Sequence, residues 1–204
     1  MIDLHTGRTG NGQRPAIFLE ELGLPYRVHV LDLGKGDQRK PEFLRLNPRG
    51  AIPVVVDDNG PGGQRLVLTQ SHAILLHYAM QENRFIPQDP MARALCLQWM
   101  SHVASDAAPT SGALFAVQNF IPEKSEANTQ FFVDRLLTNF RYIDGRLGQV
   151  EYLAGELSIA DFSLYPVYKA RHDMVESAGL RHFQRWAKTM GARPALQKAL
   201  EKIG

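Results

Sequence analysis

Strand-like patterns occur only in the first eighty residues of this 204-residue chain. Short runs rich in β-branched and aliphatic residues lie around positions 2–4, 26–30, 54–56 and 66–68, as expected of short strands. After residue 90, apolar residues instead recur at the three- and four-residue spacing of amphipathic helices. This change of pattern predicts a small α/β domain followed by an all-helical domain.

The first region has the predicted element order β-α-β-(α)-β-β-α. A helix that ends at Gly23 separates the first two strands, and a βαβ unit of this size implies a parallel pair. Asn59-Gly60 is a turn signal between the third and fourth strands, which predicts a hairpin. We predict an α/β domain at residues 1–81, a linker at 82–90 and a helical domain at 91–204.

The charge balance argues against a nucleic-acid partner. The chain has 23 Lys and Arg against 21 Asp and Glu, a net charge of +2. Its densest basic run, Lys35–Arg49, is interrupted by Asp37 and Glu42, whereas affinity for a phosphate backbone needs clustered basic residues. We therefore expect no nucleic acid to bind.

The cysteine and histidine content excludes other classes of site. The single cysteine, Cys96, rules out an internal disulfide framework and a four-cysteine zinc site. The histidines show no HExxH spacing, so no metal is expected. No apolar run approaches membrane-spanning length, and Met1–His5 lacks the features of a secretory signal. These observations predict a cytoplasmic protein with no membrane partner.

The glycine-rich loop Gly7–Gly12 follows the first strand and admits two interpretations. With Asp32 at the end of the second strand, it has the context of a dinucleotide-binding fold. However, its G-x-x-G-x-G spacing is wrong, and the chain lacks the further βαβ units that such a fold needs. The other interpretation is a thioredoxin-like domain, in which a cis proline precedes a central strand, and Pro53 before Val54 fits that position. From local sequence alone, a trans proline that starts a strand is the simpler interpretation.

Three motifs, together with the domain order, decide between these interpretations. They are Asn47-Pro48-x-Gly50-x-Ile52-Pro53-Val54, Gln70-Ser71-x-Ala73-Ile74 and Ser158-Ile159-Ala160-Asp161. On these motifs, the sequence is similar to cytosolic glutathione transferases over nearly its whole length, and Thr9-x-Asn11-Gly12-x-Arg14 resembles the bacterial Nu class. The resemblance implies a thioredoxin-like N-terminal domain, an all-helical C-terminal domain, a homodimer, and glutathione as co-substrate.

The resemblance also implies which segments bind each part of glutathione. We expect the γ-glutamyl carboxylate at Gln70 and Ser71, where free backbone N–H groups and the helix dipole favour an anion. The alternative is that Ser71 only caps its helix. Ile52 is expected to pair its backbone with the cysteinyl segment. Gln38, with the basic residues beside it, is expected to contact the glycine carboxylate, and simple solvation of this loop is the alternative.

Thr9 and Asn11 are the expected catalytic residues. A helix N-terminus lowers a thiol pKa, and hydroxyl or amide donors to sulfur favour the thiolate further. The alternative is that both residues only shape the turn. His5 stands where many relatives have a tyrosine, and we expect it to pack rather than to act. Because the loop has no cysteine and Cys96 lies on an apolar helix face, any thiol chemistry takes its sulfur from the bound peptide.

Two positions in the second region qualify the resemblance. Relatives often have an arginine early in the long helix, but Phe131 occupies that position here, and Arg135 follows one turn later. Two alternatives follow for disulfide substrates: Arg135 substitutes for the arginine, or the role is absent and the affinity implied by the resemblance is not carried over. Asp161 is expected to cap its helix rather than to take part in chemistry, because Ser158-Ile159-Ala160-Asp161 resembles a capping box.

The leading hypothesis is a glutathione transferase that conjugates glutathione to small electrophiles, reduces small disulfides without an enzyme cysteine, or does both. The first alternative is a non-catalytic module of the same fold that binds partners or regulates. It predicts loss of the ligand groups, whereas Thr9, Asn11, Pro53 and Ser71 are retained. A nucleotide-linked oxidoreductase is a third and weaker hypothesis.

Overall fold

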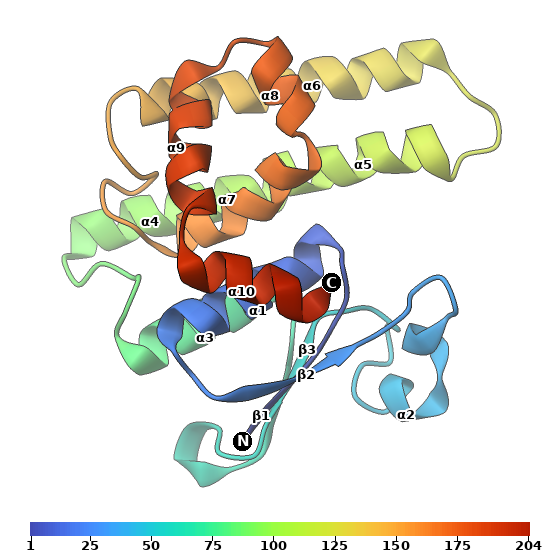
Figure 1. Cartoon of the computed structure of the whole chain (residues 1–204), viewed down its shortest axis with the longest axis vertical. Coiled ribbons are helices and arrows are strands. Elements are labelled where there is room, and N and C mark those ends of the chain that lie inside the picture. The colour runs from blue at the N-terminus through green and yellow to red at the C-terminus, as the bar shows by residue number, and fades with distance from the viewer. The chain divides into compact units, whose positions relative to one another are not determined.

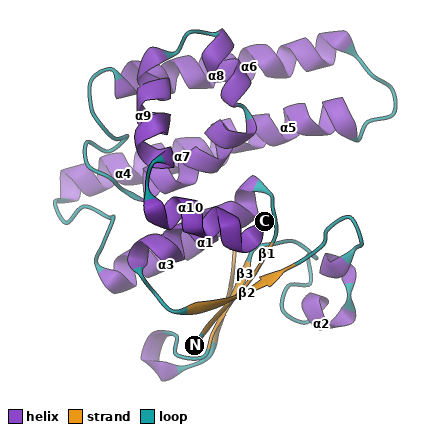
Figure 2. Cartoon of the chain, viewed as in Figure 1, coloured by secondary structure: helices purple, strands orange, loops and turns teal.

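The computed structural model describes all 204 residues and confirms the predicted fold class. Its β-strands lie within the first seventy residues, and helices make up most of the remainder (Figure 2). The contacts divide the chain into two compact units. One contains Met1–Arg84 together with Gly191–Gly204, and the other contains Phe85–Met190.

The first unit is built on a four-stranded mixed sheet with strand order β2-β1-β3-β4. β1 runs parallel to β2, as predicted, and β3 runs antiparallel to both β1 and β4. The elements are β1 (Ile2–Thr6), α1 (Gly10–Leu22), β2 (Tyr26–Val30), α2 (Pro41–Leu44), β3 (Val54–Asp57), β4 (Leu66–Thr69), α3 (Ser71–Glu82) and α10 (Pro194–Ile203).

Both faces of the sheet are covered. Residues directly opposite each other on neighbouring strands share a face, so the pairing of His5 with Val54 defines one face. On that face, Phe43 of α2 packs against Val54 and Val56. On the other face, α3 reaches the sheet through Tyr78, whose hydroxyl donates to Asp57 Oδ2 at 3.0 Å. This layering is that of a thioredoxin-like domain.

The register brings four chain segments to one edge of the sheet. His5, Val54 and Thr69 form one cross-strand row. β1, β2 and β4 all run toward this edge, and β3 starts from it. Four segments therefore meet the sheet at the same edge: those that follow Thr6, Val30 and Thr69, and the one that precedes Val54. Every segment with an expected glutathione ligand is one of these four.

The last helix, α10, packs against α1 within the first unit, and Figure 1 shows the two side by side. Arg193, just before α10, forms a two-point ion pair with the buried carboxylate of Glu21, with both N–O distances 2.7 Å. Lys198 and Lys202 both pair with Glu20. The sequence had grouped residues 194–203 with the helical region, because an amphipathic pattern reveals an apolar face but not its partner. The domain boundaries at residues 81 and 91 stay predictions.

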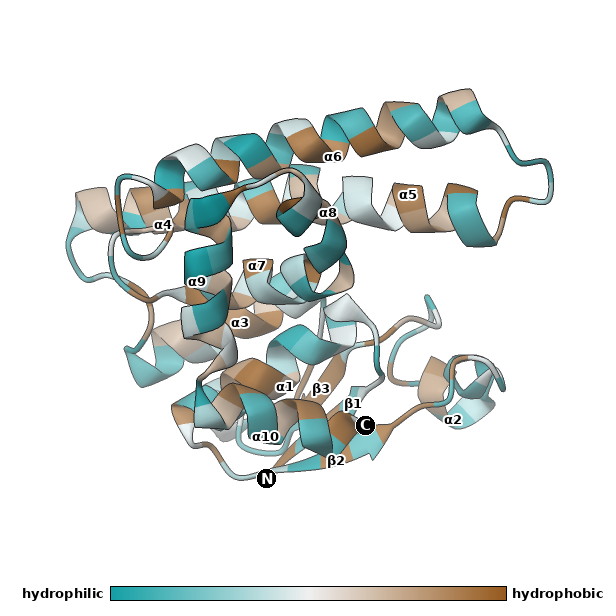
Figure 3. Ribbon diagram, turned by 45° about the horizontal axis from the view of Figure 1, so that its top comes forward, coloured by the Kyte–Doolittle hydropathy of each residue, from teal (hydrophilic) through white to brown (hydrophobic).

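The second unit is helical. It contains α4 (Pro90–His102), α5 (Ala108–Asn119), α6 (Glu126–Leu147), α7 (Ile159–Ala170), α8 (His172–Ser177) and α9 (Arg181–Gly191). A π-helical segment, Val103–Ala107, joins α4 to α5. Hydrophobic and hydrophilic residues are mixed along α6 (Figure 3), and its buried residues recur at three- and four-residue spacing, as in Leu136, Phe140 and Ile143. None of the helices combines the length and hydrophobicity that crossing a bilayer requires.

The predicted capping box at the start of α7 is confirmed. The Ser158 hydroxyl accepts a hydrogen bond from Ala160 N at 3.3 Å, and Asp161 Oδ2 accepts from Ser158 N at 3.0 Å. Asp161 Oδ1 also accepts from Leu153 N at 3.0 Å and from Trp186 Nε1 at 2.8 Å. Asp161 therefore caps α7, as expected, and connects this helix to the segments that contain Leu153 and Trp186.

Candidate functional site

Three of the four segments at the sheet edge approach each other closely. A methyl group added at Gly7 would lie 3.2 Å from the Ile52 side chain and 3.3 Å from the Leu31 carbonyl oxygen. One added at Gly50 would lie 3.1 Å from the Gln38 carbonyl oxygen. The loop after β1, the segment around Gln38 and the segment before β3 are therefore neighbours in space.

The first of these segments leads into α1, which begins at Gly10. The prediction that the loop extends to Gly12 is wrong, because Thr9 caps the helix three residues earlier, accepting a hydrogen bond from Gly12 N at 3.3 Å. Only glycine fits at position 12, since a methyl group there would lie 2.2 Å from the Gly7 carbonyl oxygen. Thr9 and Asn11 are both exposed at this helix start.

Arg14 lies beneath the exposed residues of this helix start and is only 1% exposed. Its Nη1 donates to Asn11 Oδ1 at 2.5 Å and to Ser71 Oγ at 3.4 Å. Burial lowers the pKa of the guanidinium to about 10, so Arg14 remains a cation at neutral pH. Arg14 belongs to the motif Thr9-x-Asn11-Gly12-x-Arg14, but its position in the sequence indicates no role. The spacing of Asn11 and Arg14 was the available signal, because residues i and i+3 share a helix face.

The start of α3 has two unusual features. Gln70 occupies the N-cap position with φ 69° and ψ 110°, and no side chain caps the helix. A non-glycine residue in such a conformation costs of order 1–3 kcal/mol and often marks a functional site. Ser71 is the first helical residue and is buried. Because the N-cap position belongs to Gln70, the alternative role of Ser71 as the helix cap does not apply.

The segment before β3 contains the Ile52–Pro53 peptide bond, which is cis, the geometry that the thioredoxin-like interpretation requires. Ile52 is half-buried and lies outside the sheet pairing, which begins at Val54. Its backbone is thus at the edge of the sheet, where an extended peptide can pair with it.

Gln38 lies in a short 3₁₀ turn, Asp37–Arg39, and is half-buried. Its Nε2 donates to the Leu33 carbonyl oxygen at 3.4 Å, whereas its buried Oε1 has no hydrogen-bond partner. Asp32 accepts from the backbone N–H groups of Gly34 and Lys35. Asp32 therefore shapes this turn, a local role that needs no ribose ligand.

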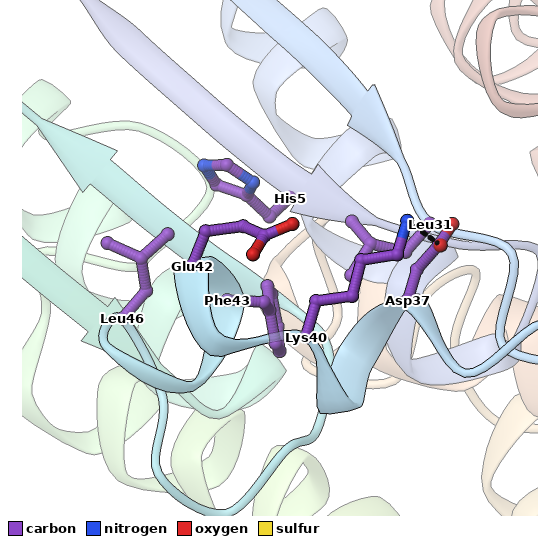
Figure 4. Close-up of a pocket in the computed structure, with 7 residues that line it drawn as sticks. All are labelled: His5, Leu31, Asp37, Lys40, Glu42, Phe43 and Leu46. Carbon is purple, nitrogen blue, oxygen red and sulfur yellow. Dashed lines mark ion pairs between the residues drawn. The ribbon is translucent and has the colours of Figure 1, made fainter.

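A separate pocket of about 270 Å³ lies on the α2 face of the sheet (Figure 4). It is lined by His5, Leu31, Asp37, Lys40, Glu42, Phe43 and Leu46. His5 stacks on His29 at a centroid distance of 4.5 Å and meets Phe43 edge-on; burial, followed by the charge of His29, lowers its pKa. His5 packs here, as expected, and none of the expected glutathione ligands lines this pocket.

The remaining singled-out residues lie in the helical unit. Cys96 is completely buried, and burial raises the pKa of its thiol, as expected of an inert cysteine. Phe131 and Arg135 are both exposed on α6. No group of three or more His, Cys, Asp or Glu side chains is arranged to hold a metal ion.

Comparisons with known proteins find similarity along the whole chain. The family model for the N-terminal domain of glutathione S-transferase matches residues 11–80. The chain is 33% identical to the disulfide-bond oxidoreductase YfcG of Escherichia coli over 205 residues, covering 99% of this chain and 95% of that protein. It is also 30% identical to the disulfide-bond oxidoreductase YghU of the same organism, covering 97% of this chain and 73% of that protein.

Solved structures agree with these sequence matches. A glutathione transferase from Pseudomonas putida, with one glutathione disulfide bound per subunit, has a TM-score of 0.93 at 30% identity, covering 100% of this chain and 92% of that chain. One from Burkholderia graminis, with two glutathione molecules bound per subunit, has a TM-score of 0.92 at 31% identity, covering 98% and 87%. Sequence and fold thus point to the same group of proteins.

Proposed function

Because the chain belongs to the glutathione S-transferase family and is a glutathione transferase, we propose that it binds glutathione as a thiolate at the sheet edge. One observation carries this proposal: the N-termini of α1 and α3 meet beside the Ile52–Pro53 peptide, tied together by Arg14. Helix N-termini favour anions. Bound glutathione would place its thiolate at the start of α1 and its γ-glutamyl carboxylate at the start of α3.

We expect the sulfur at the start of α1. Thr9 accepts a hydrogen bond from Gly12 N, and a hydroxyl that accepts can still donate its own proton. The Asn11 amide oxygen accepts from Arg14, so its N–H groups are available to the sulfur. Donors to an anion lower the pKa of its acid. Thr9 and Asn11 are therefore the groups we assign to thiolate stabilisation.

We expect the γ-glutamyl end at the start of α3. Ser71 and the backbone N–H groups of the first helical turn are suited to its carboxylate, and Gln70 lies beside them in its strained conformation. The cysteinyl segment would pair with the backbone of Ile52. The glycine end would lie near Gln38, whose unpartnered Oε1 can accept a hydrogen bond from the glycyl amide N–H.

The reaction we favour is disulfide reduction by thiol–disulfide exchange. The bound thiolate attacks one sulfur of a small disulfide, a new S–S bond forms, and the original one breaks. The other half leaves as a thiolate and takes a proton from solvent. A second glutathione attacks the mixed disulfide, releasing the second thiol product and glutathione disulfide. Two glutathione thiols supply the two electrons.

The names of the relatives support this preference. Two Escherichia coli relatives are disulfide-bond oxidoreductases, and the Pseudomonas putida enzyme has glutathione disulfide bound. The Burkholderia graminis enzyme has two glutathione molecules per subunit, which fits a reaction that uses two glutathione molecules. The same thiolate could also add to a small electrophile, forming a C–S bond, and we include that activity in the proposal.

Turnover tests the proposal directly. We expect the protein to bind glutathione in a calorimetric titration and to reduce hydroxyethyl disulfide with glutathione, or to conjugate glutathione to a model electrophile. Cys96→Ala is the matched control, because Cys96 is the chain's single cysteine and is buried; its activity should equal that of the parent. Loss of disulfide reduction in that variant would contradict the mechanism.

The two assays also discriminate the non-catalytic alternative. A binding or regulatory module would bind glutathione and turn over neither substrate, and that result would remove the proposed activity. Absence of glutathione binding would remove the proposed site as well. A homodimer and a cytoplasmic location stay predictions from the sequence; light scattering that gives the mass of one chain at micromolar concentration would contradict the dimer.

A further inference from the structure

We propose that Arg14 is a positioning residue that fixes the hydrogen-bonding direction of Asn11 and Ser71, so that the thiol and the γ-glutamyl carboxylate of bound glutathione both meet donors. This inference rests on the proposed glutathione site. It starts from three observations: Arg14 is 1% exposed, its Nη1 lies 2.5 Å from Asn11 Oδ1, and the same nitrogen lies 3.4 Å from Ser71 Oγ.

The first consequence concerns Asn11. A side-chain amide has one acceptor oxygen and one donor nitrogen, and either can point toward a ligand. Guanidinium has only donors, so its bond to Asn11 Oδ1 commits the oxygen to the protein interior. The amide N–H groups are then left on the exposed side of the residue. Arg14 thereby makes Asn11 a donor where the sulfur is expected.

The second consequence concerns Ser71. Its hydroxyl is buried and accepts a hydrogen bond from Arg14, which lies 57 residues away in the sequence. Because Arg14 can only donate, Ser71 Oγ is the acceptor, and the hydroxyl proton is free to point toward a carboxylate. Asn11 belongs to α1 and Ser71 to α3. One buried side chain, Arg14, therefore orients a hydrogen-bond donor at the start of each helix.

Charge adds to this geometry. Arg14 stays protonated at neutral pH, and an ionic attraction is stronger inside the protein than in water. A thiolate and a carboxylate above Arg14 both gain from it. Lysine at this position would keep the charge but not the planar set of donors, so charge and direction can be separated by mutation.

The test uses three variants and two measurements. Arg14→Gln removes the charge, Arg14→Lys keeps the charge and alters the donor geometry, and Asn11→Asp keeps an acceptor for Arg14 but removes the N–H donors. The first measurement is the pKa of the bound thiol, obtained from the ultraviolet absorbance of the thiolate as a function of pH. The second is the affinity for S-methylglutathione, which lacks the thiol and reports the carboxylate ends alone.

We expect Asn11→Asp to raise the bound-thiol pKa by about one pH unit or more while S-methylglutathione affinity changes less than about threefold. Arg14→Gln should raise the thiol pKa and also weaken S-methylglutathione binding by about tenfold or more. Arg14→Lys should fall between the parent and Arg14→Gln in both measurements.

The outcomes separate this inference from the proposed function. If the parent protein binds no glutathione, the proposed site fails. If the parent binds and the thiol pKa is unchanged in Asn11→Asp and Arg14→Lys, Arg14 is only a structural residue and the inference is overturned. Arg14→Lys keeps the buried charge, so it tests the inference even if Arg14→Gln does not fold.

Discussion

Helices α3 and α7 have the same length, twelve residues, but begin in opposite ways. At α7, the Ser158 and Asp161 side chains form a complete capping box, and the Asp161 carboxylate also binds groups from outside the helix. At α3, the N-cap residue Gln70 makes no capping bond and has a positive φ. Ser71, which has a suitable side chain, instead meets Arg14.

The difference indicates what each helix start is for. Four N–H groups at a helix start have no partner within the helix and need one elsewhere. The chain supplies its own partners at α7, so that start contributes to stability. It leaves the start of α3 open and in a strained conformation, which is reasonable where a ligand supplies the missing acceptor. The contrast predicts that mutations at α7 affect folding and those at α3 affect binding.

The largest expected effect is that of Asp161→Ala. The carboxylate is completely buried and accepts from Ser158, Leu153 and Trp186. Removing it leaves several buried donors without a partner, and we expect the free energy of unfolding to fall by about 3–5 kcal/mol. Urea unfolding followed by circular dichroism measures this. A loss below about 1 kcal/mol would mean that the closed start of α7 is not structurally important.

The pH dependence of stability tests the same carboxylate. Burial raises the pKa of Asp161 from 3.8 to about 6, against the opposing effect of its hydrogen bonds. Below pH 3.8 the group is protonated in both states, and its contribution to stability is complete. As pH rises toward 6, only the unfolded state loses the proton, so the free energy of unfolding falls, by up to about 3 kcal/mol.

The measurement compares the parent with Asp161→Asn, which cannot titrate. The difference between their free energies of unfolding should decrease from pH 4 to about pH 7, then become constant. A difference that increases with pH in this range would show that the hydrogen bonds outweigh burial and that the folded carboxylate has a lowered pKa.

Ser71→Ala should show the reverse pattern at α3. Its hydroxyl accepts a long hydrogen bond from Arg14, at 3.4 Å, so the free energy of unfolding should change by less than about 1 kcal/mol. Loss of a donor to a carboxylate should weaken glutathione binding by about 2 kcal/mol, or roughly thirtyfold. Calorimetry and urea unfolding on the same protein give both numbers. Destabilisation without weaker binding would contradict the comparison.

The sequence predicted the parts of this comparison that depend on local pattern. The spacing of Ser158 and Asp161 identified the capping box, and Pro53 marked the start of β3, although local sequence alone favoured a trans peptide bond where the Ile52–Pro53 bond is cis. Such features depend on a few neighbouring residues, whose conformational preferences persist in the fold. The ligand roles of Gln70 and Ser71 came from resemblance, because serine at a helix start is usually a cap.

The sequence could not predict what depends on distant neighbours. An arginine is rarely fully buried, so nothing local indicated that Arg14 bonds both Asn11 and Ser71, the second of which is 57 residues away. The pairing of α10 with α1 joins the two ends of the chain, and no local pattern specifies it. The strain at Gln70 is likewise invisible, because it comes from the turn between β4 and α3 rather than from the residue type.

Gln70→Gly tests that strain and carries the smallest expected effect. Glycine adopts a positive φ without the steric cost of a side chain, so the variant should gain about 1 kcal/mol in the free energy of unfolding relative to Gln70→Ala. Asn83→Gly, at the other end of α3, is the control. Asn83 has φ 51° and ψ 40°, a left-handed conformation that asparagine tolerates, and its replacement should change stability less. Equal gains at both positions would mean that Gln70 is not unusually strained, and the open start of α3 would then need another explanation.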